Sequence, residues 1–151
     1  MREEQVTKDI LQWLINRNWT IVCFDFPQSG TGHFLHPNGS TDKNKDTINP
    51  DIVAVKGGNC VFFENKDRFY YPDYEKVNRL IVDNQYTDDI SRLVSQYPIE
   101  RFYYGIGLPT VKHDTRSEKA SHLVDFIIGV NEDHSISILF ETNCDVKEVF
   151  E

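Results

Sequence analysis

Two acidic residues and a lysine lie around a pair of short apolar runs, and their types suit a divalent cation. Asp51 precedes the run 52–55, and Glu64 follows the run 60–63, with Lys66 two residues further on. Mg²⁺ prefers oxygen ligands such as carboxylates and keeps several waters in its sites. An ammonium group beside such an ion is placed to hold a water molecule or an anionic oxygen. These residues predict a centre for metal-assisted phosphate chemistry, provided that the fold brings them together.

A β-hairpin is expected to bring them together. The runs 52–56 and 60–63 flank Gly57-Gly58, which is a two-residue turn signal. If these glycines form the loop, counting outward places Asp51 directly opposite Glu64. The lysine two residues after the glutamate then points to the same face of its strand. Because like charges opposite each other destabilise a pair of strands, the two carboxylates predict a counter-charge or a bound cation.

With this arrangement the chain resembles the PD-(D/E)XK nuclease superfamily, which includes many type II restriction endonucleases and archaeal Holliday-junction resolvases. The motif residues are Pro50-Asp51 and, after the turn, Glu64-Asn65-Lys66. The order of elements extends a looser resemblance from the N-terminal helix to about residue 108. A surface hairpin with an ordinary Asp–Lys or Glu–Lys pair is the alternative reading of the same residues.

The resemblance implies an α/β (α+β) fold with a restriction endonuclease-like core, in which a central mixed sheet is flanked by helices in the order αβββαβ. It implies that Asp51, Glu64 and Lys66 are catalytic. It also implies that Mg²⁺, with Mn²⁺ as a substitute, is bound by the two carboxylates and the backbone carbonyl of Asn65.

The activity implied is that of a metal-dependent DNA endonuclease that hydrolyses phosphodiester bonds, and a type II restriction endonuclease is the first interpretation. A structure-selective or repair nuclease and a non-catalytic nucleic-acid-binding module with a nuclease fold are alternatives. A protein-interaction domain that uses the acidic tail and surface tyrosines is a third. A compact chain with one site cuts one strand per turnover, so cleavage of double-stranded DNA predicts a homodimer.

An amphipathic helix over residues 3–17 is expected to pack beside the hairpin. Val6, Ile10 and Leu14 recur at helical spacing. The helix begins with Glu3 and Glu4, and the resemblance implies that one of them faces the metal. Compensation of the helix dipole explains both acidic residues equally well.

The remaining elements follow the same αβββαβ order. The sequence predicts a strand at 19–26 beside that of the first carboxylate, and a helix capped by Asp73 with a second helical piece from Thr87. A strand at 100–108 then returns parallel to the second hairpin strand. A closing hairpin is expected over 123–140, and the acidic tail 141–151 is expected at the surface.

Polar and basic residues in three segments are candidates for nucleic-acid contacts. The first segment is the polar loop 27–49, which is too long for an ordinary connection. The second segment follows the motif lysine, and its basic residues are explained alternatively by a solvated helix face. The third segment is the basic stretch 111–121. The candidates are Ser29, Thr31, His33, Lys43, Lys45, Arg68, Lys76, Arg79, Lys112, His113 and Arg116.

Composition limits the class of protein. The chain has 151 residues, enough for a single domain with a sizeable core, and 39% hydrophobic and 13% aromatic residues are typical of a globular protein. Its net charge is −8, whereas nucleic-acid binders generally present a basic surface. The sequence therefore predicts a local basic patch on an acidic protein.

Cellular location is predicted from what the sequence lacks. No apolar run approaches the roughly 20 residues of a membrane span, and the N-terminal residues do not have the layout of a signal peptide. Cys23, Cys60 and Cys144 are too few and too far apart for a disulfide framework or a zinc site. A cytoplasmic protein with no membrane partner is expected.

Overall fold

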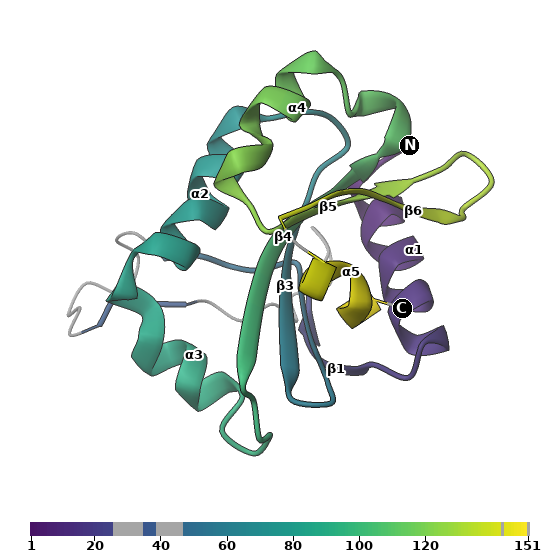
Figure 1. Cartoon of the computed structure of the whole chain (residues 1–151). Coiled ribbons are helices and arrows are strands. Elements are labelled where there is room, and N and C mark those ends of the chain that lie inside the picture. Colours follow the sequence, from purple (N-terminus) through teal and green to yellow (C-terminus); the bar gives the residue numbers. More distant parts are fainter. Residues whose placement is uncertain (26–34, 39–46, 143, 151) are drawn as a thin grey trace.

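The computed structural model describes residues 1–25, 35–38, 47–142 and 144–150. Within them, six strands form one mixed sheet, and helices cover both of its faces (Figure 1). The elements are α1 (Glu3–Asn16), β1 (Thr20–Phe24), β2 (Ile52–Lys56), β3 (Asn59–Asn65), α2 (Tyr71–Val82), α3 (Thr87–Leu93), β4 (Arg101–Pro109), α4 (Thr115–Ala120), β5 (Phe126–Val130), β6 (Ile136–Glu141) and α5 (Cys144–Phe150). Short 3₁₀ turns stand at Asn84–Tyr86, Thr110–Lys112 and Ser121–Leu123.

The strands lie in the sheet in their order along the chain. β1, β2 and β3 are antiparallel neighbours, β3, β4 and β5 run parallel, and β6 returns antiparallel to β5. The parallel crossover from β3 to β4 passes through α2 and α3, as the sequence predicted. The mixed α/β class, with a mixed sheet flanked by helices, is therefore confirmed, and two helices rather than one stand between β3 and β4.

The central hairpin forms as the diglycine turn predicted. Gly57 and Gly58 both have positive φ angles, 55° and 85°, which glycine adopts without steric cost. The register runs from Lys56 opposite Asn59 to Ile52 opposite Phe63. It stops one step short of the expected pair of acidic residues.

Different helices cover the two faces of the sheet, as Figure 1 shows with α1 and α5 to the right of β3 and β4, and α2 and α3 to the left. On the first face, Ile10 of α1 and Phe150 of α5 belong to one buried cluster with Phe63 of β3. On the second face, Val77 of α2 and Ile90 of α3 are buried with Phe62 of β3. Neighbouring residues of β3 thus point into two separate cores, since side chains alternate along a strand.

The C-terminal segment differs from the expectation of a surface tail. Val146 and Phe150 of α5 are 1% and 2% exposed and join the core beside α1. They are four residues apart and share one face of the helix. Asp145 and Glu148 of the same helix are exposed, so the acidic composition of the segment concealed an amphipathic helix.

The start of α2 also differs from the expectation. The helix begins at Tyr71, with Pro72 in its first turn, where the missing N–H of proline costs nothing. Asp73 is therefore inside the helix, 4% exposed, and does not cap it. No helix among the described residues has the length and apolar character needed to cross a membrane.

Candidate metal centre

Asp51 and Glu64 lie at the end of the β2–β3 hairpin that is remote from the diglycine turn. Backbone bonds hold Asp51 between two neighbouring strands, because its N–H donates to the Phe63 carbonyl at 2.9 Å and its carbonyl accepts the N–H of Asp25 at 2.8 Å. Its carboxylate oxygen Oδ2 accepts the backbone N–H of Asn65 at 2.7 Å. The acidic side chain is thereby directed toward the last residues of β3.

The two carboxyl groups repel each other in a poorly solvated place. Burial, followed by repulsion from Glu64, raises the pKa of Asp51 to about 9. Burial raises the pKa of Glu64 to about 7, against the opposing attraction of Lys76, and the Glu64 side chain is only 13% exposed. Desolvation favours the neutral form of a carboxyl group. Because a cation between them would relieve both effects, the pair has the electrostatics of a cation site.

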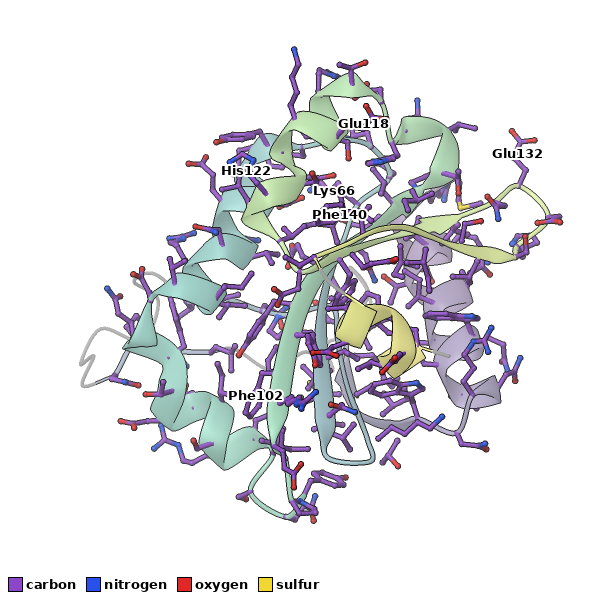
Figure 2. The ribbon with its side chains drawn as sticks, viewed as in Figure 1. Lys66, Phe102, Glu118, His122, Glu132 and Phe140 are labelled. Atoms are coloured by element: carbon purple, nitrogen blue, oxygen red, sulfur yellow. The ribbon has the colours of Figure 1, made fainter. Side chains whose placement is uncertain are left out.

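The positive charge nearest to Glu64 belongs to a different lysine from the one expected. Lys76 Nζ lies 3.1 Å from Glu64 Oε1, whereas Lys66 Nζ lies 3.7 Å from Glu3 Oε1 and 5.0 Å from the ring centroid of Tyr70. The prediction of a shared face required β3 to continue past Glu64 to Lys66, but the strand ends at Asn65. Figure 2 shows Lys66 toward the end of the sheet that is nearest α4.

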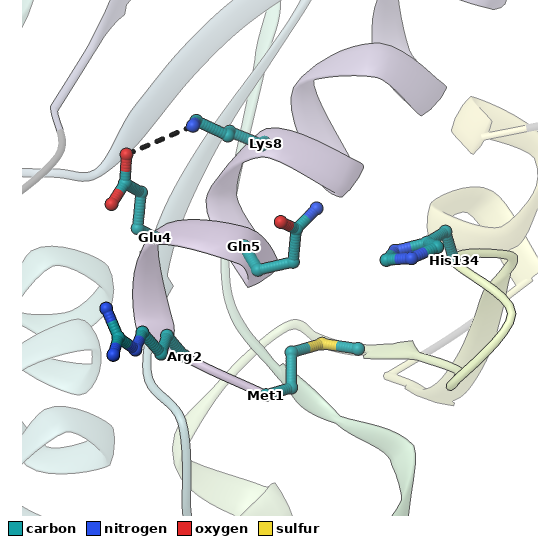
Figure 3. A pocket seen from close by; sticks show the side chains of 6 residues that line it. All are labelled: Met1, Arg2, Glu4, Gln5, Lys8 and His134. Atoms are coloured by element: carbon teal, nitrogen blue, oxygen red, sulfur yellow. Dashed lines mark ion pairs between the residues drawn. The ribbon is translucent and has the colours of Figure 1, made fainter.

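The structure distinguishes the two acidic residues at the start of α1. Glu3 pairs with Lys66 and interacts electrostatically with Asp51 and Glu64, so it faces the centre. Glu4 instead pairs with Lys8 at 3.1 Å. Figure 3 shows this pair on a separate groove, whose lining residues are Met1, Arg2, Glu4, Gln5, Lys8 and His134. Of the two metal-ligand candidates, only Glu3 is near the centre.

Asn65 links the centre to α1 through its side chain. The residue is fully buried, and its amide Nδ2 donates to Thr7 Oγ1 at 3.0 Å. Its Oδ1 has no hydrogen-bond partner among the described residues. Since the side chain is directed to α1, any role in metal binding falls to the backbone carbonyl, and that role stays a prediction.

Asp73 and the position of Lys76 are the features that sequence reasoning missed. The Asp73 carboxylate is 3.8 Å from Lys76 Nζ and interacts electrostatically with Glu64. Burial raises its pKa. Their spacing of three residues on one helix, directly after the motif, was the available signal, because residues three apart share a helix face.

The donor set fits a cation that needs few protein ligands. Within residues 1–25, 35–38, 47–142 and 144–150, no three Asp, Glu, His or Cys side chains converge closely enough to hold a metal ion. Asp51 and Glu64 supply two hard oxygen groups, and Mg²⁺ is commonly held by one or two carboxylates with waters completing its shell. Burial and repulsion disfavour the charged forms of these carboxyl groups, and a bound cation would offset both effects. The pair is therefore compatible with Mg²⁺.

The nucleic-acid contact candidates divide into three groups. Ser29, Thr31, His33, Lys43 and Lys45 lie outside the described residues. Lys76 is turned into the centre, and Arg79 and Lys112 are exposed. Arg68 pairs with Asp67 at 3.1 Å, Arg116 pairs with Asp114 at 2.8 Å, and His113 Nδ1 contacts Ser117 Oγ at 2.7 Å. The contacts of all these residues with nucleic acid stay predictions.

The chain matches no protein-family model, no curated protein and no solved structure. The likeness to the nuclease superfamily therefore depends on the motif residues and on the order of the elements that position them.

Proposed function

We propose that the chain is a metal-dependent endodeoxyribonuclease built on a restriction endonuclease-like core. The observation that carries the proposal is the pair of largely buried carboxyl groups, Asp51 and Glu64, on neighbouring strands of one hairpin, with the pKa of each raised. Perturbed titration at a cluster of charged groups is common at functional sites.

Each residue has a separate task in the proposed reaction. Asp51 and Glu64, with the backbone carbonyl of Asn65, would hold a Mg²⁺ ion. The chemistry supplied by such an ion would be Lewis-acid polarisation of the phosphodiester and a lowered pKa of a bound water. Lys66 positions the attacking water or stabilises the negative charge that develops on phosphate oxygens. Glu3, 3.7 Å from this lysine, orients its ammonium group.

A type II restriction endonuclease is the first form of this proposal, acting as a homodimer on double-stranded DNA. A structure-selective or repair nuclease is the close alternative, because nothing in the described residues indicates readout of a base sequence. The single domain provides one centre, so either enzyme cuts both strands only with a second copy.

A non-catalytic binding module is the second candidate, and one observation favours it. Lys76 already neutralises Glu64 at 3.1 Å, within a cluster that also includes Asp73. An ion-pair network of this kind also occurs as a purely structural feature of a fold, and such networks perturb pKa values as active sites do. In that case the centre stabilises the junction of α2 with β3 and performs no chemistry.

Nicking of supercoiled plasmid with Mg²⁺, compared with EDTA, tests the proposal. We expect Mg²⁺-dependent nicking that Asp51→Asn, Glu64→Gln and Lys66→Ala each abolish. The lysine variant should retain metal and DNA binding, whereas the carboxylate variants should lose metal. Glu132→Gln is the matched control, since Glu132 lies at the tip of the β5–β6 turn, far from the centre (Figure 2).

Two results would exclude the proposed roles. Full cleavage by the Lys66→Ala variant would remove Lys66 from the mechanism. DNA binding without any nicking in the unsubstituted protein, with either Mg²⁺ or Mn²⁺, would support the binding module.

A further inference from the structure

The ammonium group of Lys76 lies between two carboxylates, as a bound cation does. Its Nζ is 3.1 Å from Glu64 Oε1 and 3.8 Å from Asp73 Oδ1. The two acidic side chains are 13% and 6% exposed, while that of Lys76 is 31% exposed. The lysine stem thus reaches from the surface of α2 and places its charge between two groups that are nearly excluded from water.

Asp73 has more acceptor capacity than this lysine uses. Its Oδ2 is buried and has no hydrogen-bond partner among the described residues. An ionised carboxylate offers two oxygens and about four lone-pair positions, and an unmet buried acceptor is costly. Asp73 Oδ2 is thus a buried acceptor with unused capacity, next to the ammonium group of Lys76. This arrangement indicates a position that favours positive charge.

α2 fixes the spacing of this position. Asp73 and Lys76 are one helical turn apart, and the helix is anchored to the sheet by Tyr74 and Val77, which are 1% and 3% exposed. Glu64 is supplied by β3 and lies across from them. The position is therefore defined by a rigid helix and a central strand.

We propose that Lys76 is the resident cation of a second cation position, formed by Glu64 and Asp73. The inference rests on the proposed function, in which Asp51 and Glu64 hold the first, divalent cation. The ammonium group of Lys76 then takes the place that the second ion occupies in a two-metal site. The chain consequently holds one divalent cation, and removal of the ammonium group opens Glu64 and Asp73 to another.

The number of Mn²⁺ ions bound per chain, measured from the electron paramagnetic resonance of free Mn²⁺, tests this inference. We expect one ion for the unsubstituted protein and for Lys76→Arg, which keeps the charge. Lys76→Ala should bind two, and the double variant Asp73→Asn/Lys76→Ala should return to one. Lys119→Ala, an exposed lysine of α4, is the matched control and should bind one.

Each other outcome has a defined meaning. Two ions in the unsubstituted protein, or one in Lys76→Ala, overturn the inference. Loss of the single ion in Asp73→Asn also overturns it, because Asp73 would then be a ligand of the first ion. If the unsubstituted protein binds no ion, the proposed metal-dependent function is wrong. In that case one ion bound by Lys76→Ala, and none by the double variant Asp73→Asn/Lys76→Ala, still supports the second position.

Folding of the alanine variant is measured in the same titration. If Lys76→Ala is unfolded in chelator, recovery of its far-ultraviolet circular dichroism with added Mn²⁺ reports binding. The inference then requires that Asp73→Asn weaken this recovery at least tenfold in Mn²⁺ concentration. If Asp73→Asn leaves the Mn²⁺ concentration needed for recovery unchanged, the inference is contradicted.

Discussion

The carboxylate of Asp51 accepts a hydrogen bond from the backbone N–H of Asn65, at 2.7 Å. This bond joins the residue before β2 to the last residue of β3 and keeps the carboxyl group beside Glu64. On its own the bond lowers the pKa of Asp51, but burial and the charge of Glu64 raise it more. The hairpin therefore holds two acidic groups together in spite of their repulsion, which is a cost to the metal-free protein.

The stability of the metal-free protein should fall as pH rises. The pKa of Asp51 is raised from 3.8 to about 9 and that of Glu64 from 4.5 to about 7. The folded state therefore keeps protons that the unfolded chain has released, so unfolding is favoured increasingly between about pH 4 and pH 9. Glu3 and Asp73 are shifted in the same direction, while Lys76 stays charged across this range.

Melting temperatures in EDTA between pH 5 and pH 9 measure this effect, and Mg²⁺ should reverse it above about pH 7 by binding the ionised pair. Asp51→Asn should raise the metal-free melting temperature at pH 8, because the amide oxygen still accepts the Asn65 N–H and the folded state no longer has to keep a proton that the unfolded chain has released. A gain of about 1 kcal/mol corresponds to roughly 2–4 °C in a domain of this size. An unchanged pH profile in this variant would contradict the assignment of the repulsion to Asp51.

Glu3 and Glu4 provide a matched pair for testing the role of α1. Glu3 contacts Lys66 across the centre, whereas Glu4 pairs with Lys8 on the separate groove. We expect Glu3→Gln to slow nicking about tenfold, since it releases the lysine and removes a charge near the metal, and Glu4→Gln to change the rate less than twofold. Both substitutions keep the length and shape of the side chain, so equal effects would contradict the assignment of Glu3, and not Glu4, to the centre.

The sequence predicted the hairpin well because its register follows from local chemistry. The glycines at 57 and 58 specify the turn, and the apolar runs then fix which residues face each other. The position of Lys66 was not predictable in the same way. A strand alternates its side chains only while it continues, and β3 ends before this residue.

Lys76 occupies the place next to Glu64 for a reason that is not local. Its distance from Glu64 depends on how α2 packs on the sheet through Tyr74, Val77 and Leu80, which are buried. Sequence spacing places Lys76 on a helix face but does not determine which strand residue that face meets. The same limitation applies to α5, whose Phe150 ring meets aromatic rings from α1, β3 and β5.

Phe150, the last residue of α5, should contribute strongly to stability. Its ring lies 5.2 Å from Trp13, 5.9 Å from Trp19, 6.3 Å from Phe63 and 5.1 Å from Phe126, between ring centroids. Truncation to alanine leaves a cavity in this cluster, which typically costs about 3–5 kcal/mol. Urea unfolding of Phe150→Ala measures the loss, with Phe150→Leu as a milder control. A loss below about 1 kcal/mol would mean that α5 does not close this core.

Gly107 should be the least replaceable glycine near the candidate centre. A Cβ atom there would lie 2.3 Å from Asn65 Oδ1 and 2.5 Å from Ile10 Cδ1, so alanine must displace either the amide or α1. Overpacking of this kind costs about 1–3 kcal/mol. Movement of α1 would also shift Glu3 away from Lys66, so we expect Gly107→Ala to reduce nicking even at temperatures where the protein is folded.

Gly57→Asn is the control, because a Cβ atom at Gly57 meets nothing within 4 Å and asparagine tolerates its positive φ. If Gly107→Ala loses stability but keeps full activity, the amide of Asn65 and α1 do not position the catalytic groups, and the contact of Glu3 with Lys66 is incidental to the reaction.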